Sequence, residues 1–149
     1  AGYASGLGDP EWIAALPHFA LPLPEVPQDR TLRFFQIEGD SMLPLPSGTW
    51  VLAEFVERMQ DIGSGRPYIL STKEDGLLFK RVENRLDREG DFLCVSNNPA
   101  FTPYTLSPEE IREAWRAIGW FSTDWPQTSA DIASTLAAIK EQINPPKVD

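Results

Sequence analysis

Two residues of this 149-residue chain have side chains that could together perform nucleophilic catalysis, Ser41 and Lys80. Ser41 lies in Gly39-Asp40-Ser41-Met42, directly after a run of aromatic and β-branched residues over 33–38. Such a run is typical of a strand, and a glycine at its end lets the backbone turn and present the serine hydroxyl. The alternative interpretation is an ordinary strand end with a serine on the surface.

Lys80 lies in a second apolar segment, residues 76–83, where an alternation of period two puts it on the same strand face as Leu78 and Val82. A lysine ordinarily has a pKa near ~10.4, so few molecules carry a neutral amine at pH 7. Burial on an apolar face can lower that pKa to about 7, and a neutral amine can remove the proton of a serine hydroxyl. Serine and lysine then form a nucleophile–base pair that needs neither histidine nor aspartate. The alternative is a lysine that keeps its ammonium in water.

Further motifs accompany these two residues in a fixed order along the chain. They are Gly39-Asp40-Ser41-Met42, Pro44, Gly48, Asp61-Ile62, Gly65, Phe79-Lys80-Arg81-Val82, the Asn/Pro loop at 96–104 and the late strand at 114–120. Together they resemble the self-cleaving domain of LexA, UmuD and phage repressors, a family related to signal peptidases. The resemblance covers most of residues 30–121. It implies that Ser41 is the nucleophile, that Lys80 is its general base, and that the backbone amides of Ser41 and Met42 form the oxyanion hole.

The same resemblance implies a function. The chain would be the C-terminal regulatory domain of a LexA-like transcriptional regulator, which cleaves its own backbone at an Ala-Gly bond and so relieves repression in the SOS response to DNA damage. Ala1-Gly2 is the candidate cleavage site, and the alternative is a chance dipeptide. In the family, a RecA filament on single-stranded DNA stimulates cleavage. Operator DNA would be bound only through an N-terminal domain that precedes this sequence.

The composition limits the partners that the chain itself can bind. Thirteen basic and twenty-two acidic residues give a net charge of −9, which repels a phosphate backbone. The one cysteine, Cys94, lies in a predicted buried strand at 92–95 and has no cysteine to pair with. We find no signal peptide, no metal-ligand spacing and no apolar run long enough for a membrane span, and His18 stands alone in a proline-rich segment. We therefore expect a cytoplasmic protein that needs no cofactor or metal, and the family resemblance implies that it is bacterial or from a phage.

The remaining pattern predicts three regions in a mainly β protein. Residues 1–29 form a cleavage-site region with a short helix at 9–16 and a proline-rich connector, and residues 30–126 form the LexA-like peptidase domain, a β-barrel or β-ribbon. Residues 127–149 hold a C-terminal helix. Within the β domain we predict strands at 50–56 and 67–72 and turns at 73–76 and 88–91, the first of them from the Asp75-Gly76 pair. Residues 107–110 are predicted to form one capped helical turn.

The C-terminal helix begins near residues 128–131, and Pro145-Pro146 ends it. Its apolar residues recur at helical spacing and form one stripe, namely Ile132, Leu136, Ile139 and Ile143. A single helix of this length must bury such a stripe, either on the β domain or against a second copy. We predict a homodimer in which residues 115–122, as a late strand edge, and the 128–143 helix take part.

Two other functions are compatible with the same fold. One is a non-catalytic dimerisation or ligand-sensing module of a phage-repressor-like regulator. The other is a peptidase that acts on other chains, which the lack of a membrane segment disfavours. The presence of both Ser41 and Lys80 favours self-cleavage over the non-catalytic module.

Overall fold

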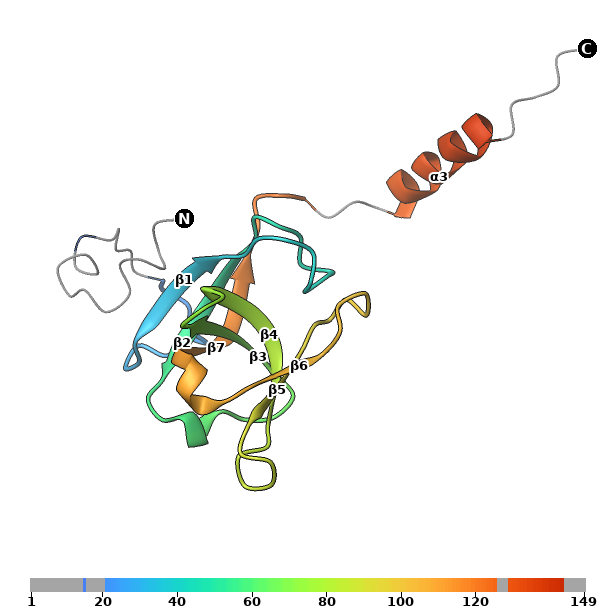
Figure 1. Ribbon diagram of the computed structural model, residues 1–149. Helices are drawn as coiled ribbons and strands as arrows, with labels where there is room; N and C mark the ends of the chain where they lie inside the picture. Colours follow the sequence, from blue (N-terminus) through green and yellow to red (C-terminus); the bar gives the residue numbers. More distant parts are fainter. Residues whose placement is uncertain (1–14, 16–20, 126–128, 144–149) are drawn as a thin grey trace, which may run out of the picture.

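The computed structural model describes residue 15, residues 21–125 and residues 129–143 of the chain. Its body is a seven-stranded antiparallel sheet with the strand order β1-β2-β7-β3-β4-β5-β6 (Figure 1). The strands are β1 (Leu32–Gln36), β2 (Trp50–Val56), β3 (Arg66–Thr72), β4 (Leu77–Asn84), β5 (Phe92–Val95), β6 (Tyr104–Leu106) and β7 (Ile111–Phe121). Two short 3-10 helices, η1 (Met59–Asp61) and η2 (Pro108–Glu110), and one helix, α3 (Ser129–Ile143), complete the described chain. The prediction of a mainly β fold is confirmed.

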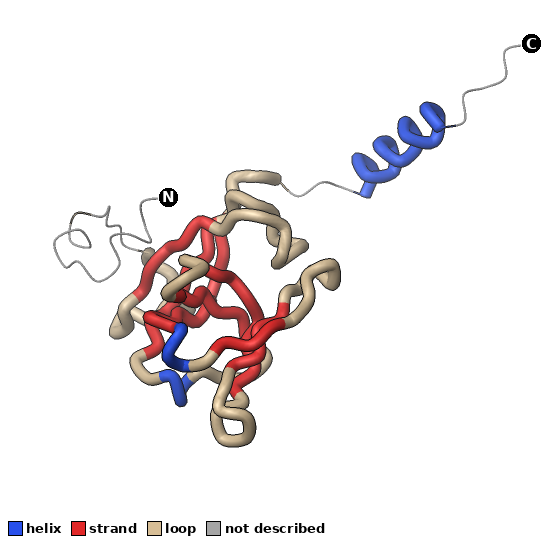
Figure 2. Tube along the Cα trace, in the orientation of Figure 1, coloured by secondary structure: helices blue, strands red, loops and turns tan. Residues whose placement is uncertain are grey.

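The sheet is curved (Figure 2), and apolar side chains pack on both of its faces. On β3, Tyr68 and Leu70 belong to one buried cluster, whereas Ile69, between them, belongs to the other with Trp115. The β4 strand alternates in the same way, because Val82 packs in the first cluster and Phe79 against the second. The central strands therefore carry apolar residues on both faces, and the period-two alternation decides which cluster each side chain enters.

The β7 strand joins the two halves of the sheet, because it pairs with β2 over 114–121 and with β3 over 111–116. The register shifts once in each pairing, between Leu52 and Ala53 and between Ser71 and Thr72. Such bulges bend a strand and increase its twist. The predicted late strand edge is therefore correct only in part, since β7 is interior over most of its length and is paired on one side alone over 117–121.

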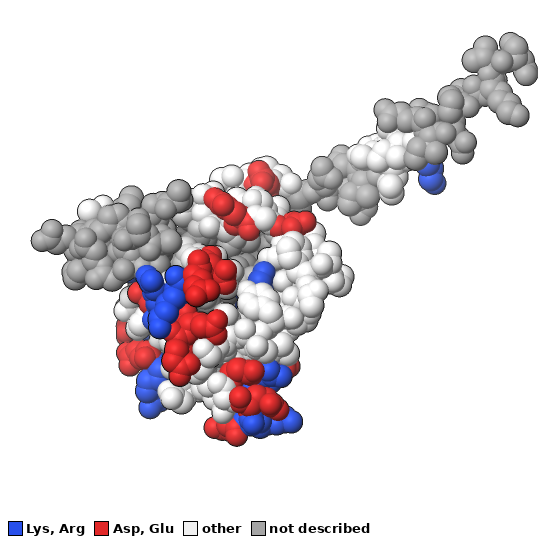
Figure 3. All heavy atoms as spheres, in the orientation of Figure 1, with Lys and Arg blue, Asp and Glu red and all other residues white. Residues whose placement is uncertain are grey.

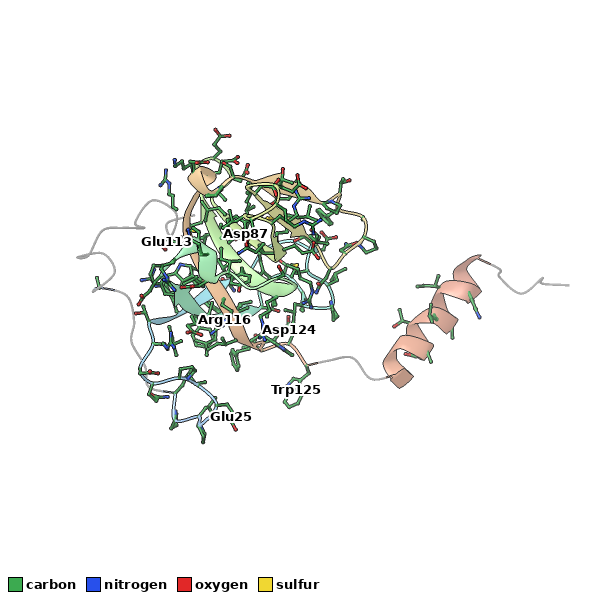
Figure 4. The ribbon with its side chains drawn as sticks, turned by 90° about the horizontal axis from the view of Figure 1, so that it is seen from below. Glu25, Asp87, Glu113, Arg116, Asp124 and Trp125 are labelled. Atoms are coloured by element: carbon green, nitrogen blue, oxygen red, sulfur yellow. The ribbon has the colours of Figure 1, made fainter. Side chains whose placement is uncertain are left out.

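An ion pair of a buried carboxylate with a partly exposed arginine links β2 and β7. Glu54 of β2 is 5% exposed and accepts a hydrogen bond from Arg116, the β7 residue directly opposite it. Arg116 is labelled in Figure 4. Arg30 lies 3.4 Å from the other carboxylate oxygen. The pairing with Glu54 also raises the pKa of Arg116 above its usual value. Two guanidinium groups thus offset the negative charge of this buried carboxylate.

The short-range predictions for the β region are confirmed. The strand predicted at 50–56 is β2, and the strand predicted at 67–72 is β3. The turn between β3 and β4 closes with a hydrogen bond of 2.7 Å from Thr72 N to Gly76 O, and Gly76 has a φ of +74°. This turn sets the register that places Lys80 opposite Tyr68.

The predicted turn at 88–91 and the capped turn at 107–110 are also present. Gly90 has a φ of +77°, and Arg85 and Asp91 form an ion pair of 2.8 Å at the base of the β4–β5 connection. In η2, Ser107 N donates to the Glu110 carboxylate at 2.6 Å in a capping box.

The C-terminal helix is confirmed as α3, which stands apart from the sheet in Figure 1. Its residues 133–140 are all exposed, and Leu136 and Ile139 of the predicted stripe are 54% and 45% exposed. These two residues are therefore not buried on the sheet, and the pairing of the helix with a second copy stays a prediction.

Three predictions concern residues that the structure does not describe. They are the helix at 9–16, of which only Ala15 is described, His18 and the Ala1-Gly2 dipeptide. The proposed division at residues 29 and 126 likewise stays a prediction. In the described ranges, no helix combines the length and the apolar character needed to cross a membrane.

Candidate active site

The structure brings Ser41 and Lys80 into direct contact, although they lie 39 residues apart in the chain. Lys80 Nζ is 2.8 Å from Ser41 Oγ, to which it donates a hydrogen bond. Lys80 extends from the middle of β4, and Ser41 lies in the connection between β1 and β2. This is the distance that a proton transfer between the two groups requires.

The turn before Ser41 forms as the glycine predicts. Gly39 has a φ of +84°, a backbone conformation that residues with a Cβ rarely adopt, and its N–H donates to Ser47 Oγ at 3.1 Å. Met42, directly after the serine, is 3% exposed and anchors the turn in the interior. Ser41 is thus held between a turn that only glycine adopts easily and a buried side chain.

Lys80 is 8% exposed, and no carboxylate of the described residues lies within 4 Å of its ammonium. Desolvation by burial lowers the pKa of Lys80 below its usual value, and the smaller effect of Cys94 opposes this shift. Cys94 itself is fully buried, as predicted, and burial raises its pKa to about 11, so its thiol is uncharged at pH 7. The surroundings of Lys80 therefore favour the neutral amine that a general base requires.

A loop that follows β5 contacts both members of the pair. Asn98 donates to the carbonyl oxygens of Asp40 and Ser41, through its side-chain Nδ2 at 3.2 Å and its backbone N–H at 3.0 Å. The Phe101 ring centroid lies 5.7 Å from Lys80 Nζ. The motif analysis included this loop but assigned no role to Asn98 or Phe101, because no local pattern indicates a contact across 58 residues.

A groove of about 680 Å³ opens beside the pair. Its walls come from the end of β1, the serine turn, the first half of β4, and single residues of β2, β3 and the Asn/Pro loop. Most wall residues are apolar, among them Phe34, Ile37, Leu78 and Phe101, and both Ser41 and Lys80 line it. A groove of this volume can hold a short extended stretch of polypeptide against the serine hydroxyl.

The amides named as the oxyanion hole remain available for an acceptor. Within the described part of the chain, the backbone N–H groups of Ser41 and Met42 donate to no protein atom, and both residues line the groove. Two such donors could stabilise the charge on a carbonyl oxygen under attack by Ser41. The arrangement can therefore provide a nucleophile, a base and an electrostatic site in one groove.

The chain was compared with known proteins. No curated protein matches it. A protein family, described as Peptidase S24-like, matches residues 4–121, a span that includes the serine turn, the β4 lysine and the Asn/Pro loop. The resemblance inferred from the motifs is thereby confirmed. The chain belongs to the Peptidase S24-like family of serine peptidases, the family of the C-terminal domains of LexA, UmuD and phage repressors.

Proposed function

We propose that this chain is the C-terminal regulatory domain of a LexA-like transcriptional regulator and that it cleaves its own backbone with Ser41 and Lys80. The observation that supports this proposal is a buried lysine that has no carboxylate partner among the described residues and whose Nζ lies 2.8 Å from a serine hydroxyl in an open groove. An ammonium in such a place has a cost in solvation that a purely structural role does not explain.

The reaction begins when the neutral amine of Lys80 accepts the proton of Ser41 Oγ. The oxygen attacks the carbonyl carbon of the scissile peptide, and the negative charge on the carbonyl oxygen is stabilised by the amides of Ser41 and Met42. The lysine ammonium then gives its proton to the departing amide nitrogen, and the C–N bond breaks. Water, deprotonated by Lys80, hydrolyses the resulting ester and restores Ser41.

The proposed scissile bond joins Ala1 to Gly2. Both residues are small, so an extended backbone can bring this bond deep into a narrow groove. The residues between Gly2 and β1 span up to about 100 Å when extended, so chain length does not limit access to Ser41. The substrate is then a segment of the same chain, and cleavage needs no diffusing partner.

Operator DNA is, in this proposal, the partner of a different domain. The net charge of −9 and the acidic side chains that border the basic ones on the face in Figure 3 make this chain a poor ligand for phosphates. Cleavage would separate the DNA-binding part from the part that dimerises, and so relieve repression during the response to DNA damage. A RecA filament on single-stranded DNA would act by favouring the cleavable conformation.

A fusion protein tests the proposal. A small folded reporter is placed before Ala1 through a flexible linker, and the fusion is incubated between pH 7 and pH 10. We expect first-order cleavage that is independent of protein concentration, becomes faster with rising pH and leaves a new N-terminus at Gly2. Rising pH speeds the reaction because it deprotonates Lys80.

Four variants of the fusion serve as controls. Ser41→Ala and Lys80→Ala should each reduce cleavage to background, and the double variant should be no slower, because nucleophile and base act as a unit. Lys80→Arg should also fail, since a guanidinium stays protonated. A wild-type fusion that stays intact at every pH, with or without a RecA filament, would favour the non-catalytic module. A new N-terminus other than Gly2 would exclude the proposed bond.

A further inference from the structure

Asn98 holds the two peptide groups on either side of the Ser41 α-carbon. Its side-chain Nδ2 donates to Asp40 O at 3.2 Å, and its backbone N–H donates to Ser41 O at 3.0 Å. The carbonyl of Asp40 belongs to the same peptide group as the N–H of Ser41, and the carbonyl of Ser41 to the same group as the N–H of Met42. In a planar trans peptide the C=O and the N–H point in opposite directions. Both N–H groups are therefore directed away from Asn98.

The groove borders the serine turn but not Asn98. Asp40, Ser41 and Met42 line the groove, whereas Asn98 is not among the described residues that line it. Neither N–H donates to a protein atom in the described part of the chain. Asn98 thus binds the carbonyl side of the serine turn and leaves both N–H groups free to bind a substrate oxygen.

The orientation of the Asn98 side chain is fixed by its hydrogen bonds. Oδ1 accepts from Ala100 N at 3.0 Å, while Nδ2 donates to Asp40 O. Exchanging the two atoms would set a donor against a donor and an acceptor against an acceptor. The loop is also tied to β4, because Arg81 Nε donates to Asn97 Oδ1 at 2.7 Å.

We infer that Asn98 is a positioning residue for the oxyanion hole, an inference that rests on the proposed function. Its side chain fixes the peptide group that carries the Ser41 N–H, and its backbone fixes the peptide group that carries the Met42 N–H. Backbone donors stabilise a transition state only when their orientation is set before the charge develops. A donor to the carbonyl also polarises the peptide group and strengthens its N–H as a donor.

The sharpest test is Asn98→Asp in the reporter fusion. Aspartate has nearly the same shape and still accepts from Ala100 N, but it sets a carboxylate oxygen against Asp40 O in place of a donor. The matched control is Asn97→Asp, which makes the same chemical change one residue away and keeps the acceptor for Arg81. Asn98→Ala removes the side-chain donor without adding a charge, and it decides the question if Asn98→Asp does not fold.

The readout is the cleavage rate as a function of pH, with the thermal unfolding midpoint measured in parallel. We expect Asn98→Ala and Asn98→Asp to lower the plateau rate at high pH by about 10- to 100-fold at temperatures where each variant is folded. The pH midpoint should stay unchanged in Asn98→Ala, because Ser41, Cys94 and Phe101 still surround Lys80. Asn97→Asp should keep a plateau within about twofold of the wild type.

Each other outcome has a defined meaning. A wild-type fusion that does not cleave sinks the proposed function, and this inference with it. Cleavage by the wild type together with an undiminished plateau in Asn98→Ala overturns the inference alone. A midpoint moved to higher pH with an unchanged plateau also overturns it, because Asn98 would then act through Lys80.

Discussion

Lys80 and Glu54 are both buried and both ionisable, but their surroundings differ. Glu54 is paired with Arg116 and Arg30, as a charge inside a protein normally is. Lys80 has a serine hydroxyl at 2.8 Å and an aromatic ring nearby, and no described carboxylate within 4 Å. The fold thus stabilises one buried charge and leaves the other destabilised, which is the arrangement that a catalytic base requires.

At the residue scale, we expect Lys80→Met to raise the thermal midpoint of the isolated chain by a few degrees near neutral pH. Burial lowers the pKa of Lys80 from 10.5, so the unfolded chain binds this proton more tightly than the folded one. The penalty in the wild type is complete below the folded-state pKa. It declines as the pH rises from that value toward 10.5.

The rise in the thermal midpoint that Lys80→Met produces should accordingly become smaller as the pH increases toward 10.5, the usual pKa of lysine. Calorimetry at several pH values measures this rise. Lys73→Met provides the control, since Lys73 is exposed and lies in the turn before β4. A gain in Lys80→Met that does not vary with pH would mean that the methionine acts by packing alone.

At the element scale, the β3–β4 turn determines where Lys80 points. Gly76 has a φ of +74°, and no atom lies within 4 Å of the place where a Cβ would be added. A substitution at Gly76 is therefore resisted by backbone conformation and not by a clash. We expect Gly76→Ala to lower the free energy of unfolding by about 1–2 kcal/mol, as measured by urea denaturation.

Gly76→Asn is the matched comparison, because asparagine tolerates the left-handed conformation better than alanine does. It should lose less than Gly76→Ala. Both variants should keep the cleavage rate of the folded protein, since the pairing of Tyr68 with Lys80 lies four residues beyond the turn. An alanine variant as stable as the wild type would show that this turn adopts another conformation in solution.

At the scale of the whole molecule, several apolar side chains lie on the surface around the end of β7. Trp120 is 62% exposed, Phe121 56% and Trp125 92%, and Trp125 projects from the end of the β region in Figure 4. Beside them, a smaller hollow of about 230 Å³ is lined by residues that include Leu45, Pro67 and Trp120. Trp115, by contrast, is 2% exposed and packs edge-to-face with two phenylalanines, so it belongs to the core.

These surfaces lead us to expect a homodimer at tens of micromolar, detected by sedimentation equilibrium. Trp120→Ser combined with Phe121→Ser should weaken the dimer at least about tenfold, because each removes a large apolar contact. A chain that ends at residue 125 lacks α3 and measures what the exposed Leu136 and Ile139 contribute. A wild-type mass equal to that of one chain would exclude the dimer at this concentration.

The sequence by itself determined the features that depend on neighbouring residues. A period of two put Lys80 on an apolar strand face, a glycine before the serine predicted the turn at 39–42, and Asp-Gly predicted the β3–β4 turn. These are properties of the local backbone, in which a few bonds and one side-chain pattern decide the conformation. The order of the motifs along the chain likewise identified the family.

Only the tertiary structure decided which of these residues meet. Lys80 contacts Ser41, which lies 39 residues away, and Asn98 donates two hydrogen bonds to the serine turn, one of them across 58 residues. The same packing buries Lys80 with no described carboxylate beside it. The order in which the seven strands pair creates these contacts. Local periodicity says which face of a strand is apolar, but it carries no record of which strand lies beside it, since that depends on the free energy of the whole packed sheet.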